Sequence, residues 1–493
     1  MRIPRCALAV ACAAWLLSAC VANGTTPSAL PATQTASAEQ QASPTQKAPD
    51  TPIPPTAATP TRTEPAPTGL NPEGPYALFE GRSGIWITNP DGTLPTRIAD
   101  QGMSPAQDLR AALSPGGDRL ALAAETEKGL DLLLIGLPDG ETTAVTRLVT
   151  VTRVERMLNS LSPESFAYNA ITEYPGLAWR PGDVELLAYI GGGVAPNADL
   201  YTYDPAGKSI RRAESDPSQA VHPMWSPRGE YLLFFGINWL PPFGVTYVTF
   251  DPMAGFWALR LSDNLIIPQE APEGTPRNVL GWRDGSHYVA YDSDSECPVR
   301  DLRAVDAAGG DSSPLVEGCL HTRPALAPEN GAILLSVDAG SEAPLDEGLF
   351  LILPDSPSPI RLSEKAAFEL SWLPESGMFY AYPQGLYGPD GDTRLDPPNA
   401  GSSYRPAVSS AGAQAWEVVE DKRHFLKIRE PGGDWQTVME GDIGAMVWDP
   451  LSGDTLLVAF ESGELYSVSA PDFTPQPIDI LAGPIERAAW IPA

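Results

Sequence analysis

The four histidines are the side chains best suited to acid–base or metal chemistry, and they are scattered along the chain. They are His222, His287, His321 and His424. The first three occupy related places in a repeated pattern, so they could meet near one face or axis of a repeat protein. Such a ring of imidazoles would suit a metal. Histidines that hydrogen-bond separately to their neighbours are the favoured interpretation, and neither a metal nor a cofactor is predicted.

Carboxylates alternate in one short stretch, residues 292–296, where the sequence is Asp-Ser-Asp-Ser-Glu. Oxygen ligands suit Ca²⁺, but the stretch lacks the glycine and the distal glutamate of an EF-hand loop, so a solvated loop is favoured. The motifs G-x-S-x-G and G-x-x-x-x-G-K-[ST] are absent. No catalytic residue is therefore predicted, and the protein is expected not to be an enzyme. Carboxylates that converge only in the fold leave no such motif in the sequence.

The N-terminus predicts export and anchoring to a membrane. Arg2 and Arg5 precede an apolar run, Ala7 to Leu17, that is too short to span a bilayer. Residues 17–20, Leu-Ser-Ala-Cys, then resemble a bacterial lipobox. The resemblance implies that residues 1–19 are a lipoprotein signal peptide and that Cys20 carries the lipid. The alternative is an ordinary signal peptide with a chance cysteine.

Residues 20–73 combine this cysteine with a segment rich in Pro, Thr, Ala and Ser that has no apolar periodicity. Such a composition cannot bury enough surface to offset the entropy of ordering, so the segment is predicted to be disordered. It would act as a stalk or as a simple tether. Both interpretations place the rest of the chain outside the cytoplasm, held at the cell membrane.

Two cysteines remain beyond the signal peptide and Cys20. They are Cys297 and Cys319. In an exported protein, one remaining pair suggests a disulfide, and two free thiols are the alternative.

A turn pattern recurs along the chain: an apolar residue or Trp, then any residue, then Pro and often Gly. Its copies begin at Leu113, Trp179, Trp225, Trp282, Leu326, Trp372, Val408, Trp448 and Trp490, with those at Trp282 and Val408 lacking the proline. Most spacings are near the ~40–50 residues of a four-stranded propeller blade. An apolar run follows most copies, then a second strand that ends in a turn such as Asp204-Pro205 or Asp251-Pro252.

The pattern resembles the TolB-like propeller repeat, in which a W-S-P-D-G turn precedes an apolar strand and a "DLY-x-x-D" strand. The match is best over residues 176–236. It also resembles the propeller of prolyl-oligopeptidase-type peptidases, but the chain stops at Ala493 directly after a copy, so no hydrolase domain is expected. The resemblance implies an all-β fold: residues 74–493 form a single β-propeller of four-stranded blades. Eight blades are preferred over nine, because propellers typically have 4–8.

The two ends of the repeat region complement each other. The first repeat has strands but no turn pattern before them, and the last pattern has no strands after it. A C-terminal strand that completes the N-terminal blade would supply both and remove two sheet edges.

Two insertions interrupt the repeats. Residues 154, 157, 158 and 161 are apolar at helical spacing, which predicts a helix or an ordered loop. Residues 237–244 hold Trp239 and Phe243 at a predicted hairpin tip. These two aromatics are either a binding lip or packing against a neighbouring blade.

The net charge of −30 argues against nucleic acid as a partner. The leading hypothesis is a membrane-anchored lipoprotein whose propeller binds an envelope protein or an extracellular ligand without catalysis. The alternatives are a solute-binding lipoprotein or sensor, and a glycan- or peptide-acting enzyme with carboxylates at the propeller axis. The sequence indicates no oligomeric state, and the fold alone does not choose among these functions.

Overall fold

The computed structural model describes residues 74–491, except 82–83, 104–106, 159–161, 193–197, 214–218, 241–248, 270–276, 357, 375, 400–401 and 479–484. Every described residue belongs to the unit Asp50–Ala493. The signal peptide, Cys20 and the linker lie outside the described residues and stay predictions. Among the residues that are described, no helix has the length and apolarity needed to cross a bilayer.

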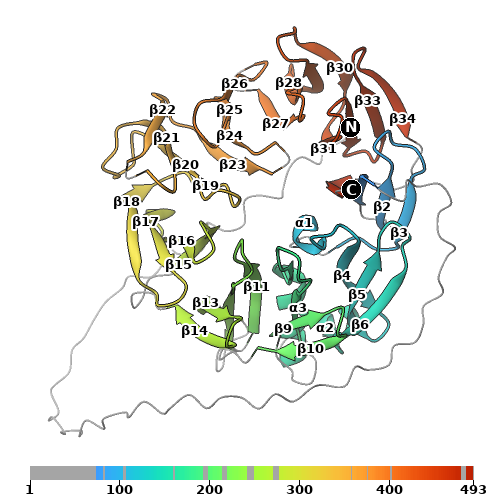
Figure 1. Cartoon of the computed structure of the whole chain (residues 1–493), viewed down its shortest axis with the longest axis vertical. Coiled ribbons are helices and arrows are strands. Elements are labelled where there is room, and N and C mark those ends of the chain that lie inside the picture. The colour runs from blue at the N-terminus through green and yellow to red at the C-terminus, as the bar shows by residue number, and fades with distance from the viewer. Residues whose placement is uncertain are drawn as a thin grey trace, which may run out of the picture. The chain divides into compact units, whose positions relative to one another are not determined.

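Within the unit Asp50–Ala493, nine antiparallel sheets follow one another around a common centre (Figure 1). In chain order the sheets are: β1 (Tyr76–Gly81), β2 (Gly84–Thr88) and β3 (Thr96–Ala99) with β35 (Ile485–Ile491); β4 (Arg119–Thr126), β5 (Gly129–Gly136) and β6 (Thr142–Val149); β7 (Leu177–Trp179), β8 (Leu187–Gly191), β9 (Asp199–Asp204) and β10 (Ser209–Arg212); β11 (Gln219–Trp225), β12 (Tyr231–Leu240), β13 (Thr249–Arg260) and β14 (Leu265–Gln269); β15 (Arg277–Trp282), β16 (His287–Asp292), β17 (Val299–Asp306) and β18 (Ser312–Leu320); β19 (Ala325–Leu326), β20 (Ile333–Val337), β21 (Gly348–Ile352) and β22 (Ile360–Ser363); β23 (Glu369–Leu373), β24 (Met378–Tyr382), β25 (Gly385–Tyr387) and β26 (Arg394–Leu395); β27 (Ser403–Val408), β28 (Gln414–Glu420), β29 (Arg423–Arg429) and β30 (Gln436–Glu440); β31 (Ile443–Trp448), β32 (Thr455–Phe460), β33 (Leu465–Ser469) and β34 (Thr474–Ile478).

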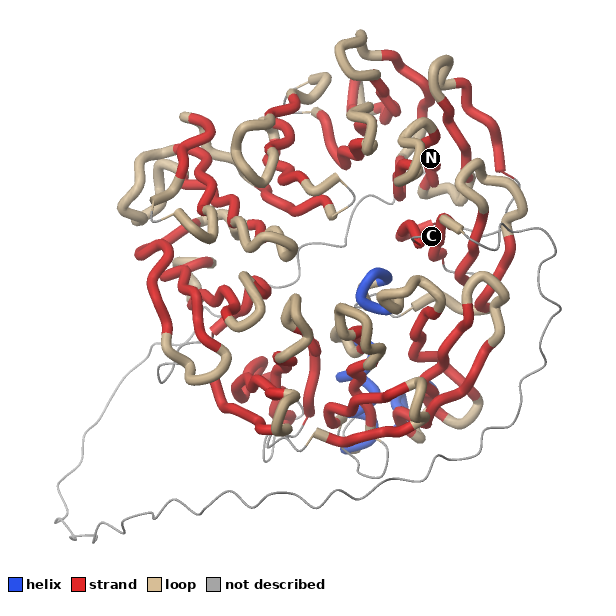
Figure 2. Tube along the Cα trace, in the orientation of Figure 1, coloured by secondary structure: helices blue, strands red, loops and turns tan. Residues whose placement is uncertain are grey.

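The all-β propeller is confirmed, and the number of blades is nine, the alternative, rather than the preferred eight. The weak copy of the turn pattern at Val408 follows the innermost strand of a complete four-stranded blade, because β27 ends at Val408. The blade of β4, β5 and β6 has three strands, because the short helix α1 (Leu109–Ala112) lies where its innermost strand would be (Figure 2). α1 contacts β4 and the innermost strands of both neighbouring blades, β7 and β35.

The predicted closure by the two ends is also confirmed. β35 pairs antiparallel with β1, from Tyr76↔Ile491 to Gly81↔Ile485. Ile485, Ala489 and Ile491 are each only 1% exposed, so the C-terminal strand fills the core of the first blade.

At three copies of the turn pattern, the tryptophan joins its blade to the one before it. Trp225 Nε1 donates to Ala178 O at 2.9 Å, and Ala178 is the residue before Trp179. Trp179 donates in the same way to Ala112 O at 2.8 Å, and Trp282 to Met224 O at 2.9 Å. The indole therefore supplies both apolar area and a hydrogen bond to the innermost element of the neighbouring blade, which is a strand for Trp225 and Trp282 and the helix α1 for Trp179.

Replacing Trp225 with phenylalanine is expected to lower the free energy of unfolding by about 1–2 kcal/mol, because the buried carbonyl of Ala178 loses its donor. Denaturant unfolding measures this change. Trp448→Phe is the matched control: Trp448 is also buried, but its Nε1 has no hydrogen-bond partner within the described structure. Equal losses for the two variants would contradict a role for the interblade hydrogen bond.

The serine and the glycine of the turn pattern allow neighbouring blades to pack closely. Ser226 Oγ accepts from Glu230 N and Tyr231 N, both at 3.1 Å, and so holds the turn closed. Gly229 has φ +65°, and a Cβ there would lie 2.5 Å from Arg180 Nε on the preceding blade. Arg180 Nε donates to Gly229 O at 2.9 Å. Glycine is required at this turn by both its conformation and the close approach.

The first insertion is helical, but its packing differs from the predicted apolar face. α2 (Arg153–Leu158) leaves Val154, Met157 and Leu158 65%, 70% and 83% exposed. A second helix, α3 (Pro163–Glu173), begins at the N-cap Ser162 and buries Phe166, Tyr168 and Ile171 in the core instead. α3 begins with Ser followed by Pro, and α2 begins with a capping box between Thr152 and Glu155, so the caps do not distinguish the helix that packs from the one that does not.

One of the two Asp-Pro turns was predicted correctly. Asp204 ends β9, and its Oδ1 accepts from Ala206 N at 2.9 Å and Gly207 N at 3.1 Å. Asp251-Pro252 was wrongly predicted to be a turn, because β13 runs through both residues. β12 continues past a register shift at Gly236/Asn238, so Asp251 pairs with Asn238 and stays in the ladder.

Candidate functional site

A cavity of about 700 Å³ lies where three consecutive blades meet, those of β23–β26, β27–β30 and β31–β34. Its volume is within the ~300–1,000 Å³ of small-molecule sites. We call it the Glu417 pocket. It is lined by Glu369, Ser371, Leu373, Tyr380, Tyr404, Arg405, Pro406, Glu417, Val419, His424, Asp442 and Glu461.

Glu417, on β28, is the buried centre of this pocket, with a side chain only 4% exposed. His424 Nδ1, on β29, lies 2.6 Å from Glu417 Oε1 and must donate, because an ionised carboxylate only accepts. Arg405 Nη1, on β27, donates to Glu417 Oε2 at 3.0 Å. Both oxygens of the buried carboxylate are thus occupied by donors, as burial of a charge requires.

The same two basic side chains reach outward to exposed carboxylates. His424 Nε2 lies 3.6 Å from Asp442 Oδ1, and Arg405 Nη2 lies 3.5 Å from Glu461 Oε1. Arg405 also donates to the backbone oxygen of Ile443. The network therefore links the blade of β27–β30 to the blade of β31–β34.

Arg405 is held in an uncommon backbone conformation, with φ +42°, at a register shift between Tyr404 and Ala407. A residue before proline normally adopts an extended conformation, so this geometry is strained. His222, before Pro223, repeats both features with φ +55° and a register shift between Val221 and Met224. The strained backbone is therefore a feature of the repeat, since it occurs in two blades. The ion pairs of Arg405 are a feature of the Glu417 pocket.

Tyrosines form one wall of the pocket. The rings of Tyr382 and Tyr404 stack with centroids 5.2 Å apart, and their hydroxyls are 3.3 Å apart. Tyr380 OH donates to Ser403 O at 3.1 Å. Burial, followed by the negative charge of Glu369, raises the pKa of Tyr380, so this phenol stays protonated at neutral pH.

Of the four histidines, only His424 lines this pocket. His287 Nδ1 pairs with Asp284 at 3.0 Å, and His321 Nδ1 pairs with Asp338 at 3.0 Å. His222 packs its ring against Phe235, and burial, then the charge of Arg323, lowers the pKa of His222. The described residues contain no group of three or more His, Cys, Asp or Glu arranged to hold a metal ion.

Two of the three carboxylates at 292–296, Asp292 and Asp294, take part in ion pairs. Asp292 is buried, and its Oδ2 lies 3.1 Å from Arg303 Nη2. Asp294 Oδ1 accepts from Glu296 N at 2.8 Å and Cys297 N at 2.7 Å, and its Oδ2 lies 3.2 Å from Arg300 Nε. Backbone hydrogen bonds from Glu296 and Cys297 lower the pKa of Asp294.

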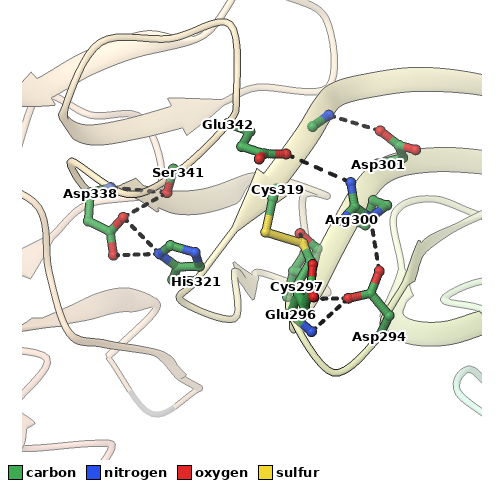
Figure 3. The surroundings of a disulfide bond; sticks show 12 residues. Asp294, Glu296, Cys297, Arg300, Asp301, Cys319, His321, Asp338, Ser341 and Glu342 are labelled. Atoms are coloured by element: carbon green, nitrogen blue, oxygen red, sulfur yellow. Dashed lines mark hydrogen bonds and ion pairs between the residues drawn. A yellow bond between two sulfur atoms is a disulfide. The ribbon is translucent and has the colours of Figure 1, made fainter.

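The predicted disulfide is present in the structure. Cys297 and Cys319 are joined, with Cα atoms 5.7 Å apart (Figure 3). Cys297 follows the Asp294 turn and Cys319 lies near the end of β18. The bond therefore ties a loop of the fifth blade to its outermost strand, beside the Arg300–Asp294 pair.

Replacing both cysteines with alanine is expected to lower the free energy of unfolding by about 3 kcal/mol, the loop-closure term for a separation of 22 residues. Chemical denaturation under oxidising conditions measures the loss. The wild-type protein under reducing conditions is the control and should lose a similar amount. A double variant as stable as the oxidised protein would contradict the stabilising role of this bond.

The predicted aromatic lip is only partly described. Trp239 lies on β12 and pairs with Phe250 of β13, while Phe243 lies outside the described residues, as does Cys20. Neither interpretation of Trp239 and Phe243 is tested.

Of the residues that line the Glu417 pocket, only His424 was singled out from the sequence, as one of four scattered histidines. One signal was available: Glu369 and Arg405 each lie three residues before the residue that begins a copy of the turn pattern, Trp372 and Val408. That register puts both on innermost strands. Glu417 and His424 carry no such signal, because their meeting depends on the pairing of β28 with β29.

No protein-family model and no curated protein sequence matches this chain. Solved structures with a similar fold include dipeptidyl peptidase 4 of Porphyromonas gingivalis, with 8% identity, a TM-score of 0.41, and 86% of this chain and 62% of that chain covered. TolB of Acinetobacter baumannii has 14% identity, a TM-score of 0.26, and coverages of 76% and 82%. The tricorn protease has 12% identity, a TM-score of 0.35, and coverages of 86% and 40%.

The structure defines this chain as a nine-bladed β-propeller. Its neighbours include TolB and the propellers of peptidases, and the chain spans less than two thirds of the length of the dipeptidyl peptidase. At these identities and TM-scores the likeness concerns the fold, and the function must be argued from the site.

Proposed function

We propose that the protein is a lipid-anchored, extracytoplasmic binding protein whose propeller takes its ligand or partner in the Glu417 pocket. The lipobox-like sequence at Cys20 and the Pro/Thr-rich segment up to residue 73 support the location. The observation that carries the binding role is the pocket itself. It is a cavity of about 700 Å³ that combines apolar, aromatic and charged side chains.

The arrangement of these charges favours binding over catalysis. The alternative, a glycan-acting enzyme, needs a carboxylic acid that can deliver a proton and a second carboxylate opposite it. Glu417, the buried carboxylate, is bonded at one oxygen to Arg405 and at the other to His424, so neither oxygen is directed at a substrate. Glu417, held by both Arg405 and His424, is suited to form a rigid part of the pocket wall that orients a ligand.

Blocking the pocket tests the binding role. Ser371 lines the cavity from β23, and Ser371→Trp would fill part of it. The purified full-length protein in detergent is screened by ligand-observed NMR against amines, alcohols, carboxylates, peptides and glycans. At least one compound is expected to bind the wild type saturably and to lose binding to Ser371→Trp. Leu265→Trp, at an exposed position on β14, is the control and should bind normally.

Two outcomes would overturn the proposal. If no compound distinguishes Ser371→Trp from Leu265→Trp, the pocket is not the binding site. If a glycan or peptide is turned over by the wild type, the protein is an enzyme.

The membrane location is tested separately through Cys20. The wild-type protein, expressed with its own N-terminus in a bacterium, is expected to enter the detergent phase on phase separation and to carry a lipid on Cys20 by mass spectrometry. Cys20→Ala is expected to enter the aqueous phase. A detergent-phase Cys20→Ala protein would contradict lipid anchoring at this residue.

A further inference from the structure

The lining of the Glu417 pocket carries a surplus of negative charge. It holds the four carboxylates Glu369, Glu417, Asp442 and Glu461 against the two basic groups Arg405 and His424. Four negative charges against two positive ones leave −2 even with His424 protonated, and −3 with it neutral. A cation gains from this field, and an anion must overcome it.

The two basic side chains are already engaged within the pocket. Arg405 is bonded to Glu417 and reaches Glu461, and His424 is bonded to Glu417 and approaches Asp442. Because each of them lies between two carboxylates, neither is available to hold an anionic ligand. The charged groups left for a ligand are therefore carboxylates.

Glu369, at the start of β23, is the lining carboxylate that is paired with neither Arg405 nor His424. Its side chain has no hydrogen bond or ion pair with any described residue of the chain, although its backbone pairs with Tyr382 of β24. Its charge nevertheless acts on the tyrosine wall, where it contributes to the raised pKa of both Tyr380 and Tyr382. The same negative charge would attract a cation bound beside these phenols.

The cavity supplies two features that a cluster of carboxylates alone would lack. Tyr380 and Tyr404 offer aromatic rings, which attract organic cations at their faces. Leu373, Pro406 and Val419 supply apolar surface that a hydrocarbon chain can cover. An inorganic cation would use neither feature.

We infer that the Glu417 pocket binds an organic cation, an alkylammonium or guanidinium group on an apolar body, with the charged group between Glu369 and the tyrosine wall. The inference rests on the proposed binding function and names its ligand class. The cation could come from a free amine or from a lysine side chain of a polypeptide, which share this chemistry.

Matched probes separate charge from shape. Hexylamine, agmatine and the peptide acetyl-Gly-Lys-Gly-amide carry the cation, 1-hexanol is the neutral counterpart of hexylamine, and hexanoate is the anionic one. Each is titrated into the full-length protein and followed by ligand-observed NMR. The amines are expected to bind at least about tenfold more tightly than 1-hexanol or hexanoate. Their affinity should fall as salt is added.

Two substitutions test where in the pocket the cation binds. Glu369→Gln is expected to weaken amine binding about tenfold and to leave 1-hexanol unchanged. Tyr404→Leu is expected to weaken it about three- to tenfold. Glu364→Gln is the matched control, because Glu364 is also an exposed carboxylate but lies in the segment after β22 and outside the pocket.

The outcomes separate this inference from the proposed function. If 1-hexanol or hexanoate binds as tightly as hexylamine, and Ser371→Trp removes that binding, the ligand class is wrong and the binding site stands. The same conclusion follows if Glu369→Gln leaves amine binding unchanged. If Ser371→Trp changes the binding of no probe, both proposals fail. Tighter binding of the peptide than of hexylamine would assign the cation to a polypeptide, and the reverse to a free amine.

Discussion

Replacing Arg405 with methionine is expected to lower the free energy of unfolding by about 3 kcal/mol, because the variant leaves the buried Glu417 without its arginine. This is the low end of the range for a broken buried pair. Arg405 is 49% exposed, so water can enter, and His424 still holds the other oxygen. Methionine keeps most of the length of the side chain, so the loss reports the charge. Denaturant unfolding at neutral pH measures it.

A double variant separates the ion pair from the strained backbone at Arg405. Arg405→Met with Glu417→Gln removes the buried charge as well and is expected to recover at least half of the lost stability. If the double variant is no more stable than Arg405→Met, the cost lies in the conformation at φ +42° rather than in the orphaned carboxylate.

Removing β35 is expected to have the largest effect on the fold. Ending the chain at Pro484 takes away the partner of β1 along its whole length. It also removes Ile485 and Ile491, each worth about 1.5–3 kcal/mol when buried. The free energy of unfolding should therefore fall by at least about 3–6 kcal/mol, and the exposed edge of β1 should promote association. Thermal unfolding and light scattering measure the two effects.

A peptide covering residues 484–493 is the control for this truncation. It is expected to bind the truncated protein and to raise its melting temperature saturably, and to leave the full-length protein unchanged. A truncated protein as stable and monodisperse as the full-length one would contradict closure by the C-terminal strand.

The fold could be predicted because its signals are local and repeated. Trp179, Trp225 and Trp282 recur in a turn whose spacing identifies a blade, and each makes the same interblade hydrogen bond. The number of blades was harder to predict. The pattern is weak at Val408, and the blade that begins near Leu113 replaces its innermost strand with α1.

Local rules failed where tertiary pairing overrode them. Asp204-Pro205 and Asp251-Pro252 are the same dipeptide, yet only the first is a turn, because β13 pairs with an extended β12 through the second. Helical periodicity correctly predicted α2, but α2 buries no residue. The helix that packs in the core is α3, whose apolar residues lie in the same cluster as those of the neighbouring blades.

The candidate site could not be predicted from the sequence, because it also depends on tertiary pairing. Arg405, Glu417 and His424 lie on three neighbouring strands, and only the register of β27, β28 and β29 brings them together. Asp442 and Glu461 then come from the next blade. Among 62 acidic residues, no spacing distinguishes Glu417, Asp442 and Glu461 from the others, and Glu369 is marked only by its place three residues before Trp372.

The central claim is that the Glu417 pocket is a ligand site, and His424 provides a direct probe of it. The chain has four histidines, and only His424 lines this pocket. In protein labelled with ¹³C-histidine, titration with hexylamine is predicted to shift the His424 ring signals saturably, while those of His222, His287 and His321 stay in place. If hexylamine binds, as judged from its own signals, and the His424 signals do not move, the ligand lies elsewhere and the claim is contradicted.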